Sequence, residues 1–306
     1  MKVKVAVVQD SPIVFNLNKT LDKVEDITTK AAKKGAKLLL FPEAFVSSYP
    51  KGLDFGARIG SRSSKGRDDF YRYYNSAISL EGSEYLRLLN IAKSNKVFLV
   101  IGIIEKTKGT LYCTILHISD EGLLLGKRRK VMPTALERIV WGFGDGSTLK
   151  AFDTKIGKIG SVICWENYMP LLRMSMYNQD VQIYCAPTAD DRNTWLPTIQ
   201  HIAMEGRCFV LSACQFLQLK DCPKDYNIKE KDPNFVIMKG GSCIISPLGK
   251  VIQKPVWNKR LVLYQDLDFK EIIKGKYDFD VTGHYSRPDI FELNINTKKN
   301  KIVNNK

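Results

Sequence analysis

The chain has 306 residues, a formal net charge of +15 and a hydrophobic fraction of 44%. This length fits one large domain or two of medium size, and the hydrophobic content is ample for a buried core, which excludes a wholly disordered chain. Glycine and proline occur at ordinary frequencies, which exclude collagen-like and low-complexity proteins.

Apolar patterns in the first half of the chain predict alternating strands and helices. Residues 18–35 predict an amphipathic helix, with Asn18 as its N-terminal cap and Gly35 at its end. Residues 51–76 predict a long polar excursion that ends in a short helix, and the apolar spacing in 83–95 predicts another helix. Strands are predicted over residues 3–8, 37–41, 97–104 and 110–118.

The second half of the chain repeats this alternation. Helices are expected after Pro170 and over 194–205, and residues 217–236 are expected to form a charged loop. No fixed-period repeat and no linker rich in Pro, Gly or Ser divides the chain, so we expect a single α/β domain over 1–296 with mixed strand pairing. Strands are predicted over 159–163, 181–185, 209–213 and 261–264, with a hairpin formed by 242–246 and 250–254.

The positive charge is spread along the chain, and part of it lies in the tail 297–306 (TKKNKIVNNK), which we expect to be flexible and solvated. A basic protein can bind nucleic acid, attract anionic substrates or simply stay soluble. The charge is not accompanied by an aromatic–basic RNA-binding motif or by zinc-finger spacing. We therefore expect no nucleic-acid partner, and we keep a non-catalytic basic binding protein as a distant alternative.

Cysteine usage and the apolar runs indicate the compartment. The seven cysteines never have Cys-x-x-Cys spacing and only three histidines are present, so a metal site of the usual zinc spacing is not supported. Scattered cysteines within apolar runs are typical of reduced, buried thiols. The N-terminus lacks a secretory signal pattern and no apolar run is long enough for a membrane span. We expect a cytoplasmic protein that does not bind membranes.

Three polar residues follow apolar runs: Glu43 follows KLLLFP, Lys130 lies in GKRRK after the LLL of 123–125, and Cys164 follows IGSVI. Functional groups in α/β sheets gather at the carboxyl ends of strands. A cysteine thiol is mostly protonated near neutral pH, so a nucleophilic cysteine needs a neighbouring base or cation. If they lie together, Glu43 would take the thiol proton and Lys130 would stabilise negative charge on a substrate. Each residue alone is better explained as a core thiol, a solvated charge or a helix cap.

The segments around these residues are FPEAFVSSYP, GKRRKVMPTALERIVWGFGDGSTL and GSVICWENYMPLLR. They resemble, in the same order, the three signature segments of the nitrilase branch of the carbon–nitrogen hydrolase superfamily. The resemblance extends from Val3 to about Leu293 and is greatest to plant-type and related bacterial nitrilases. It implies a four-layer αββα sandwich with mixed sheets, built as one carbon–nitrogen hydrolase domain.

The resemblance also implies the active site. It places the catalytic glutamate, lysine and cysteine of the family on Glu43, Lys130 and Cys164, and a second catalytic glutamate on Glu137. It implies chemistry without a metal or an organic cofactor.

Further residues are expected to form the pocket. The resemblance implies that the backbone N–H of Trp165 stabilises charge beside the nucleophile and that Tyr49 lines the pocket. Tyr168 stands where the family often has arginine, so we expect it to influence which nitrile fits. Arg128 stands where the family commonly has histidine.

The reaction implied by the resemblance is the hydrolysis of an organic nitrile to a carboxylic acid and ammonia through a cysteine thioimidate and thioester, with some amide as a possible product. An amidase or carbamoylase of the same superfamily shares the catalytic residues and remains an alternative. The resemblance further implies a homo-oligomer, with a dimer as building block and a spiral filament as a larger assembly.

Overall fold

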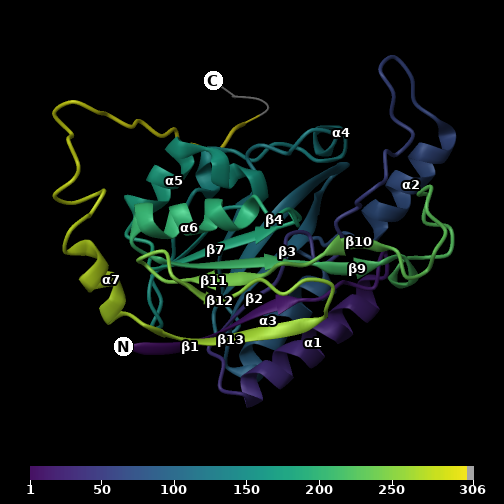
Figure 1. Cartoon of the computed structure of the whole chain (residues 1–306). Helices are drawn as coiled ribbons and strands as arrows, with labels where there is room; N and C mark the ends of the chain where they lie inside the picture. Colours follow the sequence, from purple (N-terminus) through teal and green to yellow (C-terminus); the bar gives the residue numbers. More distant parts are fainter. Residues whose placement is uncertain (302–306) are drawn as a thin grey trace.

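Two β-sheets lie face to face at the centre of the computed structural model, which describes residues 1–301 (Figure 1). The first sheet has six strands in the order β13-β1-β2-β3-β4-β5. Its central strands β1, β2 and β3 are parallel, and β13, β4 and β5 are antiparallel to their neighbours. The strands are β1 (Lys2–Gln9), β2 (Leu38–Leu40), β3 (Phe98–Thr107), β4 (Thr110–Ile118), β5 (Leu124–Arg129) and β13 (Leu261–Asp268).

The second sheet has five strands in the order β12-β11-β8-β7-β6, with β6, β7 and β8 parallel. Its strands are β6 (Ile159–Ser161), β7 (Ile183–Thr188), β8 (Phe209–Cys214), β11 (Cys243–Ile245) and β12 (Val251–Gln253). The predicted hairpin is confirmed as β11 and β12. The predicted loop over 217–236 was wrong at both ends, because β9 (Phe216–Gln218) pairs there with β10 (Val236–Lys239).

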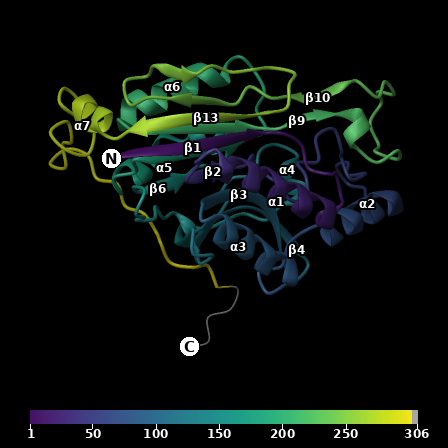
Figure 2. The same cartoon turned by 90° about the horizontal axis from the view of Figure 1, so that it is seen from below.

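Helices cover the outer face of each sheet. Helices α1 (Leu17–Lys33) and α3 (Ser83–Asn95) pack on the first sheet, and α5 (Pro170–Tyr177) and α6 (Trp195–Gly206) pack on the second. Figure 2 shows α1 and α3 on the opposite side of the sheets from α6. The remaining helices are α2 (Ser64–Asn75), α4 (Glu137–Val140) and α7 (Lys270–Lys276). None of the helices in residues 1–301 is long and apolar enough to cross a membrane.

Strand β1 shows why its sequence is almost continuously apolar. Successive side chains of a strand point to opposite faces, so Val5 and Val7 enter the core between the sheets while Ala6 and Val8 enter the core beneath α1. Both faces are buried, which requires apolar residues on both. The layers are therefore helix, sheet, sheet and helix, and the predicted αββα fold is confirmed.

Helix α1 begins earlier than predicted. The side chain of Asn16, not Asn18, caps it by accepting a hydrogen bond from the Lys19 backbone N–H at 3.1 Å. A cap precedes the first helical residue and accepts from a backbone N–H two or three residues further on; Leu17 is already helical, so Asn18 lies inside the helix. The end was predicted more closely, since Gly35 has a φ of +87° just beyond the helix.

The chain beyond α7 returns to the loop that follows α4. The backbone N–H of Asn300 donates to Asp145 Oδ2 at 2.8 Å. The expectation of a flexible basic tail over 297–306 falls partly outside the described residues, at 302–306.

Candidate active site

Glu43 lies on the turn that follows β2, and a glycine in the neighbouring strand makes room for this turn. A Cβ atom on Gly102 would lie 2.2 Å from the Pro42 carbonyl oxygen and 2.6 Å from the Ala44 nitrogen, so only glycine permits the approach. The side-chain amide of Gln215 donates to the Glu43 carbonyl oxygen at 2.8 Å. The Glu43 side chain is fully buried.

Lys130 follows β5 directly, and its side chain is also fully buried. Its Nζ donates to Glu43 Oε1 at 2.7 Å and to Glu137 Oε2 at 2.7 Å. Strand alternation turns its neighbours Lys127 and Arg129 to the other face, where both pair with Glu105. The KRRK segment is thus not a uniformly solvated charge run.

Cys164 is the first residue of the short 3₁₀ helix η2 (Cys164–Tyr168), at the sharp turn that follows β6. Its φ of +51° lies in the left-handed region, which costs a non-glycine residue roughly 1 kcal/mol and which surrounding contacts must hold. The side-chain amide of Asn167 donates to the carbonyl oxygens of Cys164 and Val162 at 2.8 and 2.9 Å. The Thr188 hydroxyl donates to the Cys164 Sγ at 3.2 Å.

A buried ion pair ties the Cys164 turn to the Lys130 strand. Arg128 Nη2 lies 3.1 Å from Glu166 Oε1, and both side chains are fully buried. Glu166 also accepts the backbone N–H groups of Val131 at 2.6 Å and Ile163 at 3.1 Å. Arg128, noted as a departure from the family pattern, therefore supports the chain on both sides of the site.

Glu137 completes the cluster from the first turn of α4. Its Oε2 accepts the Lys130 ammonium and the Thr134 backbone N–H, the latter at 2.6 Å. Its Oε1 accepts the Tyr49 hydroxyl at 2.6 Å. Glu137 is thus held by three donors and places a second carboxylate on Lys130.

The electrostatics of the cluster follow from burial and charge. Burial raises the pKa of Glu43, Lys130 lowers it and Glu137 raises it further, with a net upward shift. Burial and the Glu43 charge also raise the pKa of Cys164 above the usual thiol range. Burial alone would lower the pKa of Lys130, but Glu43, Cys164 and Glu137 raise it well above its usual value. Cys164 is therefore a resting thiol beside a permanent cation.

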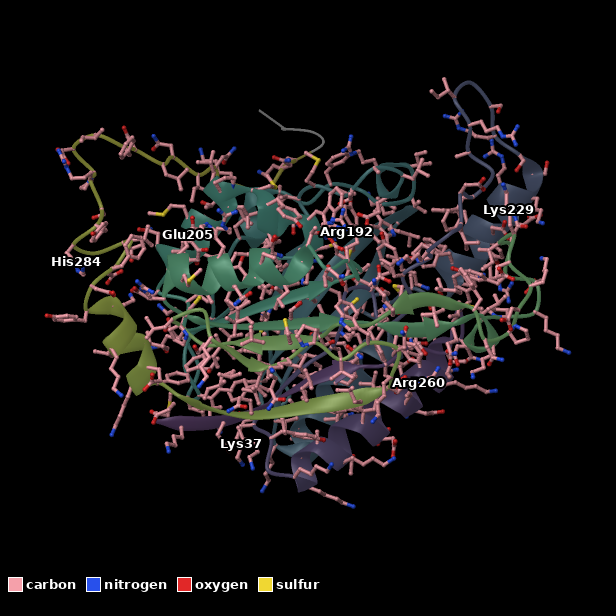
Figure 3. The ribbon with its side chains drawn as sticks, viewed as in Figure 1. Lys37, Arg192, Glu205, Lys229, Arg260 and His284 are labelled. Carbon is pink, nitrogen blue, oxygen red and sulfur yellow. The ribbon has the colours of Figure 1, made fainter. Side chains whose placement is uncertain are left out.

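A cavity of about 210 Å³ opens onto Cys164. Of the predicted pocket residues, Tyr49 and Trp165 line it. The Trp165 indole N–H donates to Asp190 at 2.8 Å. The guanidinium of Arg192 covers the Trp165 ring, 4.7 Å from its centroid. Arg192, labelled in Figure 3, lies on the segment between β7 and α6. The remaining lining residues are Lys51, Thr134, Glu137, Ala189, Asp190, Asp191 and Arg192.

We expected Tyr168 to form part of the pocket. It is not among the residues that line the cavity within residues 1–301. Its ring contacts those of Trp165 and Trp195, with centroids 5.9 and 6.0 Å away. Side chains three residues apart in a 3₁₀ helix lie above one another, so Tyr168 packs on Trp165 rather than beside Cys164.

The structure thus brings Glu43, Lys130, Glu137 and Cys164 together, with Tyr49 and Trp165 at the cavity. Sequence reasoning missed Thr188 and Glu166. The APT segment and the CWEN segment contain them, but neither pattern states which atom each side chain contacts. Among residues 1–301, no cluster of three or more His, Cys, Asp or Glu side chains is arranged to hold a metal ion.

Comparisons with known proteins agree with this architecture. A solved carbon–nitrogen hydrolase of Helicobacter pylori G27 superimposes with a TM-score of 0.75 at 18% identity, covering 94% of this chain and 97% of that one, which shows a shared fold. A nitrilase of Bradyrhizobium diazoefficiens is 51% identical over 98% of this chain and 94% of its own length. A bifunctional nitrilase/nitrile hydratase of Lupinus angustifolius is 50% identical over 95% of this chain and 85% of its own.

The family profile gives the same result. Residues 4–277 match the carbon–nitrogen hydrolase profile, which is nearly the whole of the sandwich. The relatives above are about half identical to the chain over most of their length. The relationship is therefore one of sequence as well as of fold. The chain belongs to the carbon–nitrogen hydrolase family, and within it to the nitrilases.

Proposed function

We propose that this protein is a nitrilase that hydrolyses an organic nitrile to its carboxylic acid and ammonia, with Cys164 as the nucleophile. The observation that carries the proposal is the buried cluster of one thiol, one ammonium and two carboxylates beneath a cavity of about 210 Å³. The nitrilases that are about 50% identical to the chain support the choice of nitriles.

The first chemical step forms a thioimidate. The thiol proton of Cys164 passes to Glu43 as the sulfur attacks the nitrile carbon, and one π bond of the nitrile becomes a lone pair on nitrogen. Lys130 stabilises the negative charge on that nitrogen, which then takes up the proton from Glu43. The product is a neutral thioimidate on Cys164, and Glu43 is again a carboxylate.

Hydrolysis then needs two water molecules. Glu43 takes a proton from the first water as its oxygen adds to the thioimidate carbon, and it passes this proton to the nitrogen, which gives a tetrahedral intermediate with a hydroxyl and an amino group. Glu43 then transfers the hydroxyl proton to the amino nitrogen as the carbonyl forms and the carbon–nitrogen bond breaks, and ammonia leaves. The remaining thioester is attacked by the second water, the carbon–sulfur bond breaks, and the acid leaves while the thiol is re-formed. Glu137 keeps Lys130 in place through the 2.7 Å contact and contributes a second negative charge.

An amide arises if the carbon–sulfur bond breaks before the carbon–nitrogen bond. The relative from Lupinus angustifolius is named as both a nitrilase and a nitrile hydratase, which supports some amide output here. An amidase or carbamoylase is the second candidate, because the cluster suits both reactions. The relatives named nitrilases favour the first candidate.

Matched nitrile and amide pairs test the proposal. We expect faster ammonia release from the nitrile of each pair, and loss of detectable turnover in a folded Cys164→Ala variant. Cys185→Ala is the matched control, because Cys185 is a buried thiol on β7 in the core between the sheets. A consistent preference for amides would refute nitrilase activity, and turnover by Cys164→Ala would refute the nucleophile.

We also propose a homo-oligomer. The outer face of α5 and α6 exposes large apolar side chains, including Leu171, which is 69% exposed, and Met204, which is 42% exposed. Light scattering tests the assembly, and a fully active monomer would refute a need for it.

A cytoplasmic location is supported by seven free thiols, six of them buried. A filter-binding assay at physiological salt tests the distant alternative of a basic protein that binds nucleic acid.

A further inference from the structure

Cys113, a second cysteine, contacts the catalytic cluster and is not used by the proposed reaction. It lies on β4 and is 1% exposed. Its Sγ is 3.6 Å from Glu43 Oε1, and its carbonyl oxygen accepts the Lys130 backbone N–H at 2.8 Å. One residue thus contacts the side chain of the general base and the main chain of the cation.

We propose that Cys113 is a positioning residue that holds Glu43 Oε1 through a thiol hydrogen bond and so presents Oε2 to Cys164. This inference rests on the proposed function, in which Glu43 is the base.

The two oxygens of Glu43 have different surroundings. Oε1 accepts from Lys130 Nζ and lies beside the Cys113 thiol. Oε2 is buried and has no hydrogen-bond partner among residues 1–301. The Cys164 thiol is close enough to the Glu43 carboxyl group to influence its pKa. A buried oxygen without a partner is costly, and a catalytic role is one reason for a protein to keep one. Because a carboxylate can turn about its last bond, the donors on Oε1 keep Oε2 directed at the nucleophile.

Cys113 acts as a donor because it stays protonated. Burial and the Glu43 charge raise its pKa well above the usual thiol range. The charged or titratable groups that face Glu43 are Lys130 from the end of β5, Glu137 from α4, Cys164 from η2 and Cys113 from β4. Lys130 and Cys113 are the donors to Oε1, and a hydrogen bond to the ionised form favours that form. Loss of the thiol should therefore raise the pKa of Glu43.

The variants separate the hydrogen bond from packing. Cys113→Ala and Cys113→Val both remove the donor, and valine, which is somewhat larger than cysteine, keeps the space filled and suits a strand. Cys113→Ser retains a donor at nearly the same place. Cys185→Ala is the matched control, because burial alone raises the pKa of its thiol. If the alanine variant does not fold, the valine variant gives the donor-free measurement.

Two measurements report the effect. The first is the pH dependence of kcat/KM on a nitrile. We expect the acid limb of this profile to shift upward by about half a pH unit in both donor-free variants. In Cys113→Ser and Cys185→Ala the acid limb should stay near its position in the parent enzyme. The second is the rate of alkylation at Cys164 by iodoacetamide, resolved by peptide mass spectrometry. This reaction needs no nitrile, so it tests the inference even if the proposed substrate class is wrong.

The expected alkylation result is an acid limb that shifts upward by the same amount in the two donor-free variants. Unchanged pH profiles for both reactions in folded Cys113→Ala or Cys113→Val would overturn the proposal. An equal shift in Cys185→Ala would also overturn it, because packing alone would then account for the effect.

Discussion

Arg128→Leu leaves the Glu166 carboxylate buried without its cationic partner. Both side chains are fully buried, and removing one partner of such a pair costs about 3–5 kcal/mol. Glu166 retains two backbone N–H donors, from Val131 and Ile163, so we expect the lower end of that range, about 3 kcal/mol. Urea unfolding of parent and variant, followed by fluorescence, measures the difference in the free energy of unfolding.

Two further variants sharpen this test. Arg87→Leu is the control, because Arg87 pairs with Asp22 and Glu25 at the surface and its loss should cost less than about 1 kcal/mol. Adding Glu166→Gln to Arg128→Leu removes the unpaired charge but keeps an acceptor, so it should restore about half of the lost stability. A loss below about 1 kcal/mol in Arg128→Leu, or no recovery in the double variant, would refute this reasoning.

Three shorter predictions concern the site and its surroundings. Gly102→Ala should lower kcat at least about tenfold, because its Cβ would displace the turn that carries Glu43; near-parent turnover would contradict this. Glu137→Gln should lower kcat about a hundredfold with an unchanged circular dichroism spectrum, since it removes a charge that faces Lys130; a change in KM alone would argue against it. Burial and a nearby arginine lower the pKa of His117 to about 3, so below pH 6.5 the unfolded state alone gains a proton. From pH 7 to pH 5 the free energy of unfolding should fall by about 2 kcal/mol, and His117→Phe should reduce this fall. An equal fall in the variant would contradict the assignment of the pH dependence to His117.

Much of the fold was predictable because strands that are buried on both faces consist of long apolar runs, which are visible in the sequence. The runs that end near Glu43 and Cys164 marked the carboxyl ends of strands, and the sheets bring those ends together with the end of β5, which Lys130 follows. Helix α7 was missed because only a few of its residues are apolar, and Ile272 is buried while Ile273 is exposed. Strand β5 was missed because its second half is charged.

The supporting contacts of the site were not predictable in the same way. Cys113 and Thr188 come from strands of opposite sheets, and their contacts with Glu43 and Cys164 depend on how the two sheets face each other. The burial of Arg128 depends on its pairing with the Glu166 carboxylate. Glu166 lies in η2, which follows β6 of the other sheet. The position of Tyr168 has a local reason, since closeness in sequence to Cys164 does not state which way a side chain points, and the Tyr168 ring packs on that of Trp165.

Covalent attachment of the substrate to Cys164 is the central claim, and mass spectrometry tests it most directly. The enzyme is mixed with a nitrile that it turns over, quenched with acid within the first turnovers and digested. We predict an added mass equal to the thioimidate or the acyl group on the peptide that contains Cys164, and its absence in Cys164→Ala, which should also release no ammonia. Steady turnover with no adduct at Cys164, or turnover by Cys164→Ala, would contradict the account.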